Sequence, residues 1–403
     1  LLGTVGGLAA LGLLVAREDE TDTSPRWRSP ERRVQAARVD AAVAELQRFV
    51  ETERGLTFRR DVEVSLATDD EIRTLLVDQL EEERTELEQS QATLRALGLL
   101  EPQDDLFEMA ASFVGSGVLG FYDPVEDRLV VRGQQLTPLV RATIAHELTH
   151  ALQDQHFDLE RPQLDDRDDE SSLALTALAE GDAARVEDSY RESLSASDRS
   201  RADAEEERLS RAAVEALRTS QIPAGVLVML LEAQALGPNA VQGILDAGGD
   251  GRLDEAFRSL PTTSEQLIDP ERLLRGEPPL AVDPPAAGGR VLDHGVLGQY
   301  ALQVVLQLSD DGTAIDPARS ERAARAAQGW GGDRYVTWRA RKDACIRVTW
   351  AMDTPGDLGE LGDALDAWAR PRPGARVDRS DTTITLTACD AVAGARLPAS
   401  RLA

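Results

Sequence analysis

The chain of 403 residues is long enough for two domains of ordinary size, so a buried core and a formed active site are both feasible. Acidic residues outnumber basic ones by 72 to 44, which gives a formal net charge of −28. Such a surface repels phosphate groups and anionic lipid headgroups, so nucleic acid is excluded as an expected partner.

The chain begins with an apolar segment, LLGTVGGLAALGLLVA at 1–16, and turns charged at Arg17. A helix needs roughly 20 apolar residues to span a bilayer, and this segment is shorter. Three interpretations stay open: a membrane anchor, the remnant of a signal peptide, or an ordinary buried helix. The first two place the protein outside the cytoplasm, anchored or secreted, with membrane contact through this segment only. Residues 17–30 are expected to form a short linker.

Hydrophobic spacing predicts alternating helices and strands over the next hundred residues. This order is typical of a compact α+β domain. The predicted elements are a helix from Pro30 to about Glu53, a strand at 61–67, a long helix at 69–98, a short helix at 105–113, and two strands at 117–124 and 127–133.

The stretch RATIAHELTHALQDQHFDL, residues 141–159, holds three of the four histidines. Thr137 suits an N-cap and Pro138 the first helical position, so a helix is predicted to begin there. His146 and His150 are four residues apart, so they project from one face of this helix and can share a metal ion. Glu147 beside them is placed to accept a proton from zinc-bound water. A separate apolar stripe is expected to face the core, formed by Val140, Ile144, Leu148 and Leu152.

A catalytic zinc usually takes a third protein ligand, and Glu180 is the best candidate. It lies on a predicted second helix, on an inward stripe with Leu173, Ala177 and Ala184. A carboxylate among small apolar residues is costly to bury unless it is paired or binds metal. The alternative is an ordinary exposed helix residue. Two acids, Asp182 and Glu187, are candidates for orienting the histidines, and Gly181 is expected to let the two helices approach closely.

Other polar residues give weaker signals. His156 is turned away from the ligand face, so a hydrogen-bonded structural histidine is expected. His294 is expected at the surface or at a helix cap, although it could stabilise an oxyanion with Tyr300. Tyr122 is a candidate for lining the site. The acidic run at 165–170 lacks the ligand spacing of a known calcium loop and is expected to be solvated.

The second half of the chain is predicted to hold helices and then a separate α+β domain. Residues 200–275 read as mostly helical, with breaks at Pro223 and at Gly-Gly-Asp-Gly. The Pro/Gly-rich segment 276–289 is the expected domain boundary, and it separates a domain at 31–275 from one at 290–403. The latter is predicted to contain helices at 295–308, 316–328 and 357–369, and strands at 334–340, 345–351, 375–378 and 382–388.

The only two cysteines, Cys345 and Cys389, lie at the ends of strand-like runs. In an exported chain, antiparallel neighbours would bring the start of one strand beside the end of the other, which favours a disulfide. Two reduced structural thiols are the alternative.

Three motifs carry a resemblance to a known family: GFYDP, AHELTHALQDQHF and ALAEGDA. They resemble the zincin metallopeptidases of the gluzincin type. More closely, the chain is similar to a poorly characterised family of bacterial and archaeal metallopeptidase-like and surface proteins, over residues 40 to 370. The later motifs DEAFRSLPTTSEQLIDPERLL, GWGGDRYVTW and WAMDT also match. Relatives tend to have His-Pro where this chain has Asp269-Pro270, so any role of that histidine is not carried over.

The resemblance implies a zincin-like metallopeptidase domain at 31–275, with His146, His150 and Glu180 as zinc ligands and Glu147 as general base. We expect zinc-dependent hydrolysis of a peptide or protein substrate outside the cytoplasm. By analogy with other zincins, residues 127–133 are expected to offer an edge strand to the substrate. Two alternatives stay open: a non-catalytic surface binding protein with the same fold, and a hydrolase of other bonds that uses the same metal.

Overall fold

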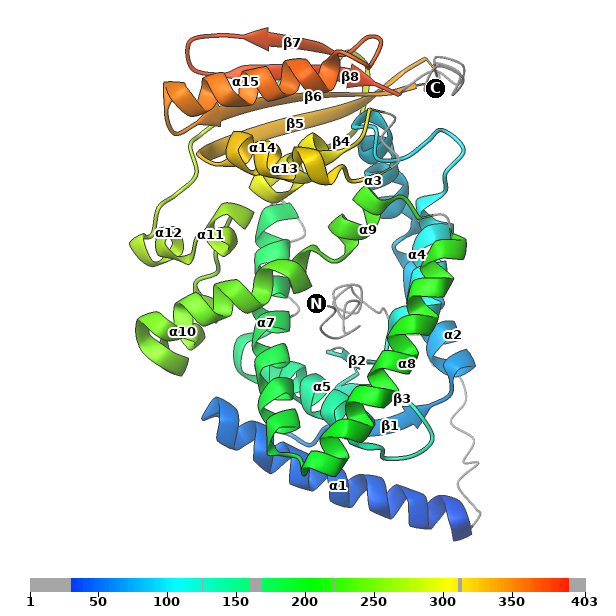
Figure 1. The fold of residues 1–403 in the computed structure, drawn as a ribbon. Helices are drawn as coiled ribbons and strands as arrows, with labels where there is room; N and C mark the ends of the chain where they lie inside the picture. The colour runs from blue at the N-terminus through cyan, green and yellow to red at the C-terminus, as the bar shows by residue number, and fades with distance from the viewer. Residues whose placement is uncertain are drawn as a thin grey trace.

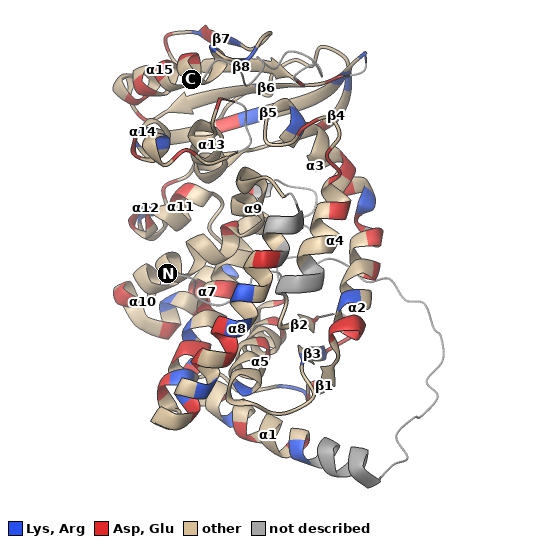
Figure 2. Ribbon diagram, turned by 45° about the vertical axis from the view of Figure 1, so that its right-hand side comes forward, with Lys and Arg blue, Asp and Glu red and all other residues tan. Residues whose placement is uncertain are grey.

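The computed structural model describes residues 30–124, 126–159, 169–220, 222–310, 314–341 and 343–390. The apolar segment 1–16, the linker up to residue 29 and residues 165–168 of the acidic run lie outside the described residues. Helices and two separate sheets make up the fold, which confirms the α+β class (Figure 1). Acidic and basic residues alternate along many of the helices (Figure 2).

The single long helix predicted at 69–98 is wrong, because the chain turns at Glu83. There α2 (Asp69–Glu82) ends and α3 (Arg84–Ala96) begins, with Glu83 at φ −91° and ψ 3°. The two halves bury their apolar sides against different partners. Leu80 of α2 packs beside α4 (Leu106–Gly117), whereas Ala96 of α3 packs into the core of the C-terminal sheet. One straight helix could not serve both cores.

The first sheet has three strands in the order β1-β3-β2: β1 (Glu63–Ala67), β3 (Arg128–Arg132) and β2 (Gly120–Asp123). β1 runs parallel to β3, and β2 runs antiparallel to it. The expectation that 127–133 forms an edge strand is therefore wrong, since β3 lies in the centre. The edge strand β2 is buried at all four residues.

Long helices surround this sheet. α5 packs on β2 and β3 and against α1, α7 and α8, while α7 packs along α10 (Figure 1). The predicted breaks are confirmed: Pro223 precedes α9, and α10 kinks at Gly248 and Gly249. The helices are α1 (Pro30–Arg54), α5 (Pro138–Phe157), α7 (Asp169–Ser193), α8 (Ala196–Ser220), α9 (Ala224–Leu230) and α10 (Glu232–Arg258).

In the described part of the chain, no single helix is both long and apolar enough to cross a bilayer. The helices α9 and α10, which meet at an angle of 45°, are together long and apolar enough for a broken membrane span, judged by length and composition alone.

The C-terminal sheet is antiparallel, with strand order β4-β5-β6-β8-β7. One face packs its large apolar side chains, among them Val348 and Trp350, into a core shared with helices. Helices lie along this sheet in Figure 1. The strand β4 was not predicted. The elements are β4 (Arg290–Gly295), α13 (Gly298–Gln307), α14 (Pro317–Ala327), β5 (Trp330–Ala340), β6 (Asp343–Met352), α15 (Pro355–Ala369), β7 (Arg376–Arg379) and β8 (Ile384–Cys389).

The predicted disulfide is confirmed. Cys345 of β6 lies directly opposite Cys389 of β8 in the antiparallel register, and the two sulfurs are bonded. A structural disulfide indicates an oxidising environment outside the cytoplasm.

The helices α11 (Ser264–Ile268) and α12 (Pro270–Arg275) lie at the junction between the N-terminal part of the chain, up to α10, and the C-terminal part that begins at β4. Ser264 donates to the buried carboxylate of Glu170 from its hydroxyl (2.8 Å) and accepts from the Tyr300 N–H (3.2 Å). It therefore joins the start of α7 to α13. Asp269 caps α12 by accepting from the Glu271 N–H.

Candidate metal centre

The helix that carries the His-Glu-x-x-His motif begins as predicted. Thr137 accepts the Val140 N–H at 3.2 Å, and Pro138 occupies the first turn. The predicted apolar stripe is buried from Val140 to Leu152, but so is nearly every other residue of α5. His146 and His150 thus face a second helix in the interior of the protein.

That second helix is α7, and it brings Glu180 between the histidines. Glu180 Oε2 lies 3.5 Å from His146 Nε2, and Glu180 Oε1 lies 3.7 Å from His150 Nε2. The two Nε2 atoms are 3.2 Å apart. All three side chains are only 3 to 5% exposed. Among the described residues, this is the one group of three whose ligand atoms all lie within 4.8 Å of one another.

The other ring nitrogens are held by neighbours that fix their protonation. His146 Nδ1 lies 3.1 Å from Glu187 Oε2, and His150 Nδ1 lies 3.0 Å from Gln153 Oε1. Both partners are oxygens that accept, so each Nδ1 carries the proton. In the neutral rings both Nε2 atoms then offer lone pairs to the same point.

The charges around this point are strongly coupled. Burial lowers the pKa of His146, but hydrogen bonds to Glu180 and Glu187 outweigh burial and raise that pKa well above its usual value. Burial also lowers the pKa of His150, which remains below its usual value. The carboxylates thus favour a positive charge on His146 but not on His150.

These donors fit a metal ion. Two imidazole nitrogens on one tetrahedral zinc, each at about 2.0–2.1 Å, lie about 3.3 Å apart, close to the separation of the two Nε2 atoms. Glu180 Oε1 is buried without a hydrogen-bond donor in the described part of the protein. A bound cation would satisfy Glu180 Oε1 and the two converging Nε2 atoms together, in place of the proton that the carboxylates favour on His146.

Glu147 lies beside the cluster without joining it. Burial, assisted by the nearby carboxylates of Glu180 and Glu187, raises the pKa of Glu147 to about 8. The Tyr122 N–H donates to its carboxylate, while Glu147 Oε2 has no hydrogen-bond partner among the described residues. The group is therefore a buried carboxylate with a free oxygen, which suits proton transfer.

Tyr122 does not present its side chain to this site. Its ring is buried, and its hydroxyl donates toward Asp127 (2.8 Å) and Asp154 (3.1 Å). Its contact with the site is the backbone N–H alone.

The other two histidines, His156 and His294, lie away from the metal centre. His156 Nε2 lies 2.8 Å from the Thr57 carbonyl oxygen, which confirms a hydrogen-bonded structural histidine. His294 is exposed on β4, where its backbone pairs with Val336, so it is a surface residue. Tyr300 packs its ring at the junction of the two halves. Burial and the charge of Glu232 raise its pKa to about 12.

Gly181 has a different partner from the predicted one. A Cβ at this position would lie 2.4 Å from the backbone C and O atoms of Gly237 in α10. The close approach therefore joins α7 to α10, and not to α5.

Sequence reasoning missed two residues that support the metal centre. Gln153 follows the motif by three residues, which places its amide beside His150 on the same helix. Arg54 ends α1 and pairs with Asp182 at 2.7 Å. Its position 92 residues before His146 gives no local signal.

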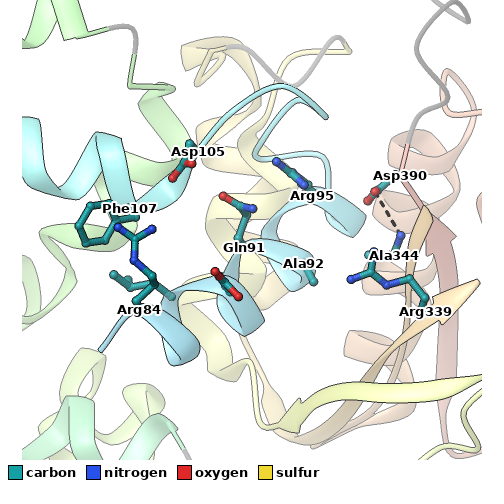
Figure 3. Close-up of a pocket in the computed structure, with 11 residues that line it drawn as sticks. Arg84, Gln91, Ala92, Arg95, Asp105, Phe107, Arg339, Ala344 and Asp390 are labelled. Carbon is teal, nitrogen blue, oxygen red and sulfur yellow. Dashed lines mark hydrogen bonds between the residues drawn. The ribbon is translucent and has the colours of Figure 1, made fainter. Parts of the chain in front are cut away.

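A separate cavity lies where α3 meets the C-terminal sheet (Figure 3). Arg84 and Arg95 line it from α3, and Arg339 and Asp390 from the sheet. None of the metal-centre residues lines this cavity.

Comparison with known proteins covers only the C-terminal part. A family model described as a domain of unknown function, DUF8575, matches residues 289–396, a range that includes the whole five-stranded sheet. Neither a curated protein nor a solved structure matches the chain at a significant level.

Proposed function

We propose that the protein is a zinc-dependent hydrolase of peptide bonds, acting outside the cytoplasm on a peptide or protein substrate. The observation that carries this proposal is the convergence of His146, His150 and Glu180 with the free carboxylate oxygen of Glu147 beside them. Two imidazoles and one carboxylate are a common protein ligand set for catalytic zinc. The zincin-like motifs of the sequence agree with this assignment.

In the proposed mechanism, His146, His150 and Glu180 hold the ion. When bound, zinc supplies a Lewis acid that polarises the scissile carbonyl and lowers the pKa of a water molecule. Glu147 accepts the proton of the attacking water and passes it to the leaving amine. Glu187 and Gln153 keep the two imidazole rings in the tautomer that ligation requires.

A non-catalytic surface binding protein with a zincin-like fold is the second candidate. One observation favours it: the ligands are almost fully buried, and so is the neighbouring edge strand β2. A closed cluster of this kind stabilises a fold without admitting a substrate. The catalytic candidate requires that the buried cluster becomes accessible to a substrate beside β2.

The test combines metal analysis with a peptide-library digest. We expect about one zinc per chain in the wild type, loss of zinc in His150→Ala, and full zinc in His156→Ala, a matched histidine of the same helix. Cleavage by the wild type and by His156→Ala, but not by His150→Ala, supports the enzyme. Zinc binding without cleavage of any peptide favours a zinc-stabilised binding protein. Absence of zinc from the wild type rules out the zinc hydrolase and leaves a metal-free binding protein.

A further inference from the structure

Arg54 is an unusual residue of this protein, because its charge is completely buried among three aspartates. Its side chain and that of Asp182 are both 0% exposed, and Arg54 Nε lies 2.7 Å from Asp182 Oδ2. The remaining guanidinium nitrogens lie 3.0 Å from Asp254 and 3.4 Å from Asp250, both on α10. The last residue of α1 thus joins α7 to α10.

Asp182 connects this ion pair to the motif helix. The oxygen that faces Arg54, Oδ2, also accepts a hydrogen bond from Gln153 Nε2 at 2.9 Å. Asp182 Oδ1 accepts from Arg185 at 2.9 Å. The carboxylate is therefore held by donors on both oxygens and cannot turn freely.

The amide of Gln153 has one permitted orientation as a result. Its Nε2 donates to Asp182 and to the Ala179 carbonyl oxygen at 3.1 Å, so both neighbours on that side are acceptors. A flipped amide would direct its oxygen at two acceptors, which is repulsive. Gln153 Oε1 must then face His150 Nδ1, at 3.0 Å.

This orientation decides which nitrogen of His150 carries the proton. Since Oε1 only accepts, Nδ1 donates and Nε2 keeps its lone pair toward Glu180 and His146. The Nδ1 atom of His146 has a more direct partner, the carboxylate of Glu187. The two histidines therefore depend on different neighbours. His146 is held by the carboxylate of Glu187, whereas His150 is held by the neutral amide of Gln153, which a buried ion pair orients in turn.

We propose that Arg54 is a positioning residue of the metal centre, which acts through Asp182 and Gln153 to fix the ring of His150 and so sets the affinity for the metal ion. This inference rests on the proposed function insofar as the ion is zinc. Without the guanidinium of Arg54, the buried carboxylate of Asp182 lies near two other aspartates, and only the partly exposed Arg185 remains to balance their charges. The local packing then opens, and the amide of Gln153 is no longer confined to one orientation.

The experiment measures zinc affinity by competition with a chelator in the full chain. Loss of a residue that orients a zinc ligand typically weakens binding 10- to 100-fold. We expect this loss in Arg54→Met and no change in Arg272→Met, a matched control. Arg272 also pairs with several acids, among them Asp353 at 2.8 Å, but it lies in α12, away from the metal centre.

Two further variants keep the test decisive if Arg54→Met does not fold. Gln153→Leu leaves the ion pair of Arg54 and Asp182 in place but cuts its link to His150, so it should weaken zinc binding to the same extent. Arg54→Met combined with Asp182→Asn removes both charges and leaves an acceptor for Gln153, so zinc affinity should recover toward that of the wild type. The His150 Nδ1 proton resonance of the zinc-loaded protein should persist in this double variant and disappear in Gln153→Leu.

The outcomes separate this inference from the proposed function. Wild-type zinc affinity in a folded Arg54→Met protein, or in Gln153→Leu, overturns the role of Arg54 and leaves the zinc centre standing. An equal loss in Arg272→Met also overturns it, because general destabilisation would then be the cause. A wild-type protein that binds no zinc overturns the metal centre and the inference together.

Discussion

Replacing Glu147 by glutamine tests the proposed chemistry most directly. The side chain is 3% exposed, and glutamine has nearly the same volume, so the packing around it should be retained. Glutamine can still accept from the Tyr122 N–H through its carbonyl oxygen. Because Glu147 is not among the three ligands, Glu147→Gln should bind zinc as the wild type does.

The expected kinetic effect is large. Glutamine cannot take a proton from water, and general-base assistance is worth about 10²- to 10⁴-fold in rate. This corresponds to roughly 3 to 5 kcal/mol in the activation free energy. The assay compares initial rates of peptide cleavage at equal zinc content, with Glu108→Gln, an exposed residue of α4, as the matched control. Equal rates for wild type and Glu147→Gln would show that Glu147 is not the base.

The same variant gives a second readout in the metal-free protein. Burial raises the pKa of Glu147 from 4.5 to about 8. Because the pKa of Glu147 is higher in the folded state than in the unfolded state, its contribution to the free energy of unfolding is complete below pH 4.5. This contribution is lost as the pH rises through 8. Glu147→Gln should therefore melt at a higher temperature than the wild type at pH 9, but not at pH 4. A difference in melting temperature that does not grow with pH would refute this account of burial.

Four further predictions follow from single contacts. Glu180→Ala should lose zinc by elemental analysis while keeping its far-ultraviolet circular dichroism; full zinc content would assign the third ligand elsewhere. Burial and neighbouring carboxylates raise the pKa of Glu170, so Glu170→Gln should increase the melting temperature at pH 8 and not at pH 4; a constant difference would contradict this. Replacing Cys345 and Cys389 by serine removes a crosslink with a sequence separation of 44. Loop entropy predicts that the free energy of unfolding falls by about 4 kcal/mol, which urea denaturation can measure. An unchanged denaturation midpoint would contradict this. Gly181→Ala forces a Cβ against the backbone of α10 and should destabilise by about 1–3 kcal/mol or more in the same assay; a neutral effect would refute the close approach.

Local rules of the chain determined much of the candidate site. The helical repeat placed His146 and His150 on one face, and Thr137 with Pro138 marked where their helix begins. Each of these features depends on residues within one or two turns of one another. The cysteine pair was also predictable, because strand ends and an oxidising environment restrict the partners of only two thiols.

Tertiary packing decided the features that join distant segments. At Glu83 the predicted long helix divides into α2 and α3, which pack into two different cores. The central position of β3 depends on its parallel pairing with β1, whose residues precede their partners in the chain by 65 positions. The ion pair of Arg54 with Asp182 spans 128 positions along the chain. No spacing rule reports such pairs, because a side chain's partner across the core is fixed by how whole helices pack. The sequence by itself thus determined the motif helix α5 and its two histidines, and only the packing of α1, α7 and α10 determined what holds them in place.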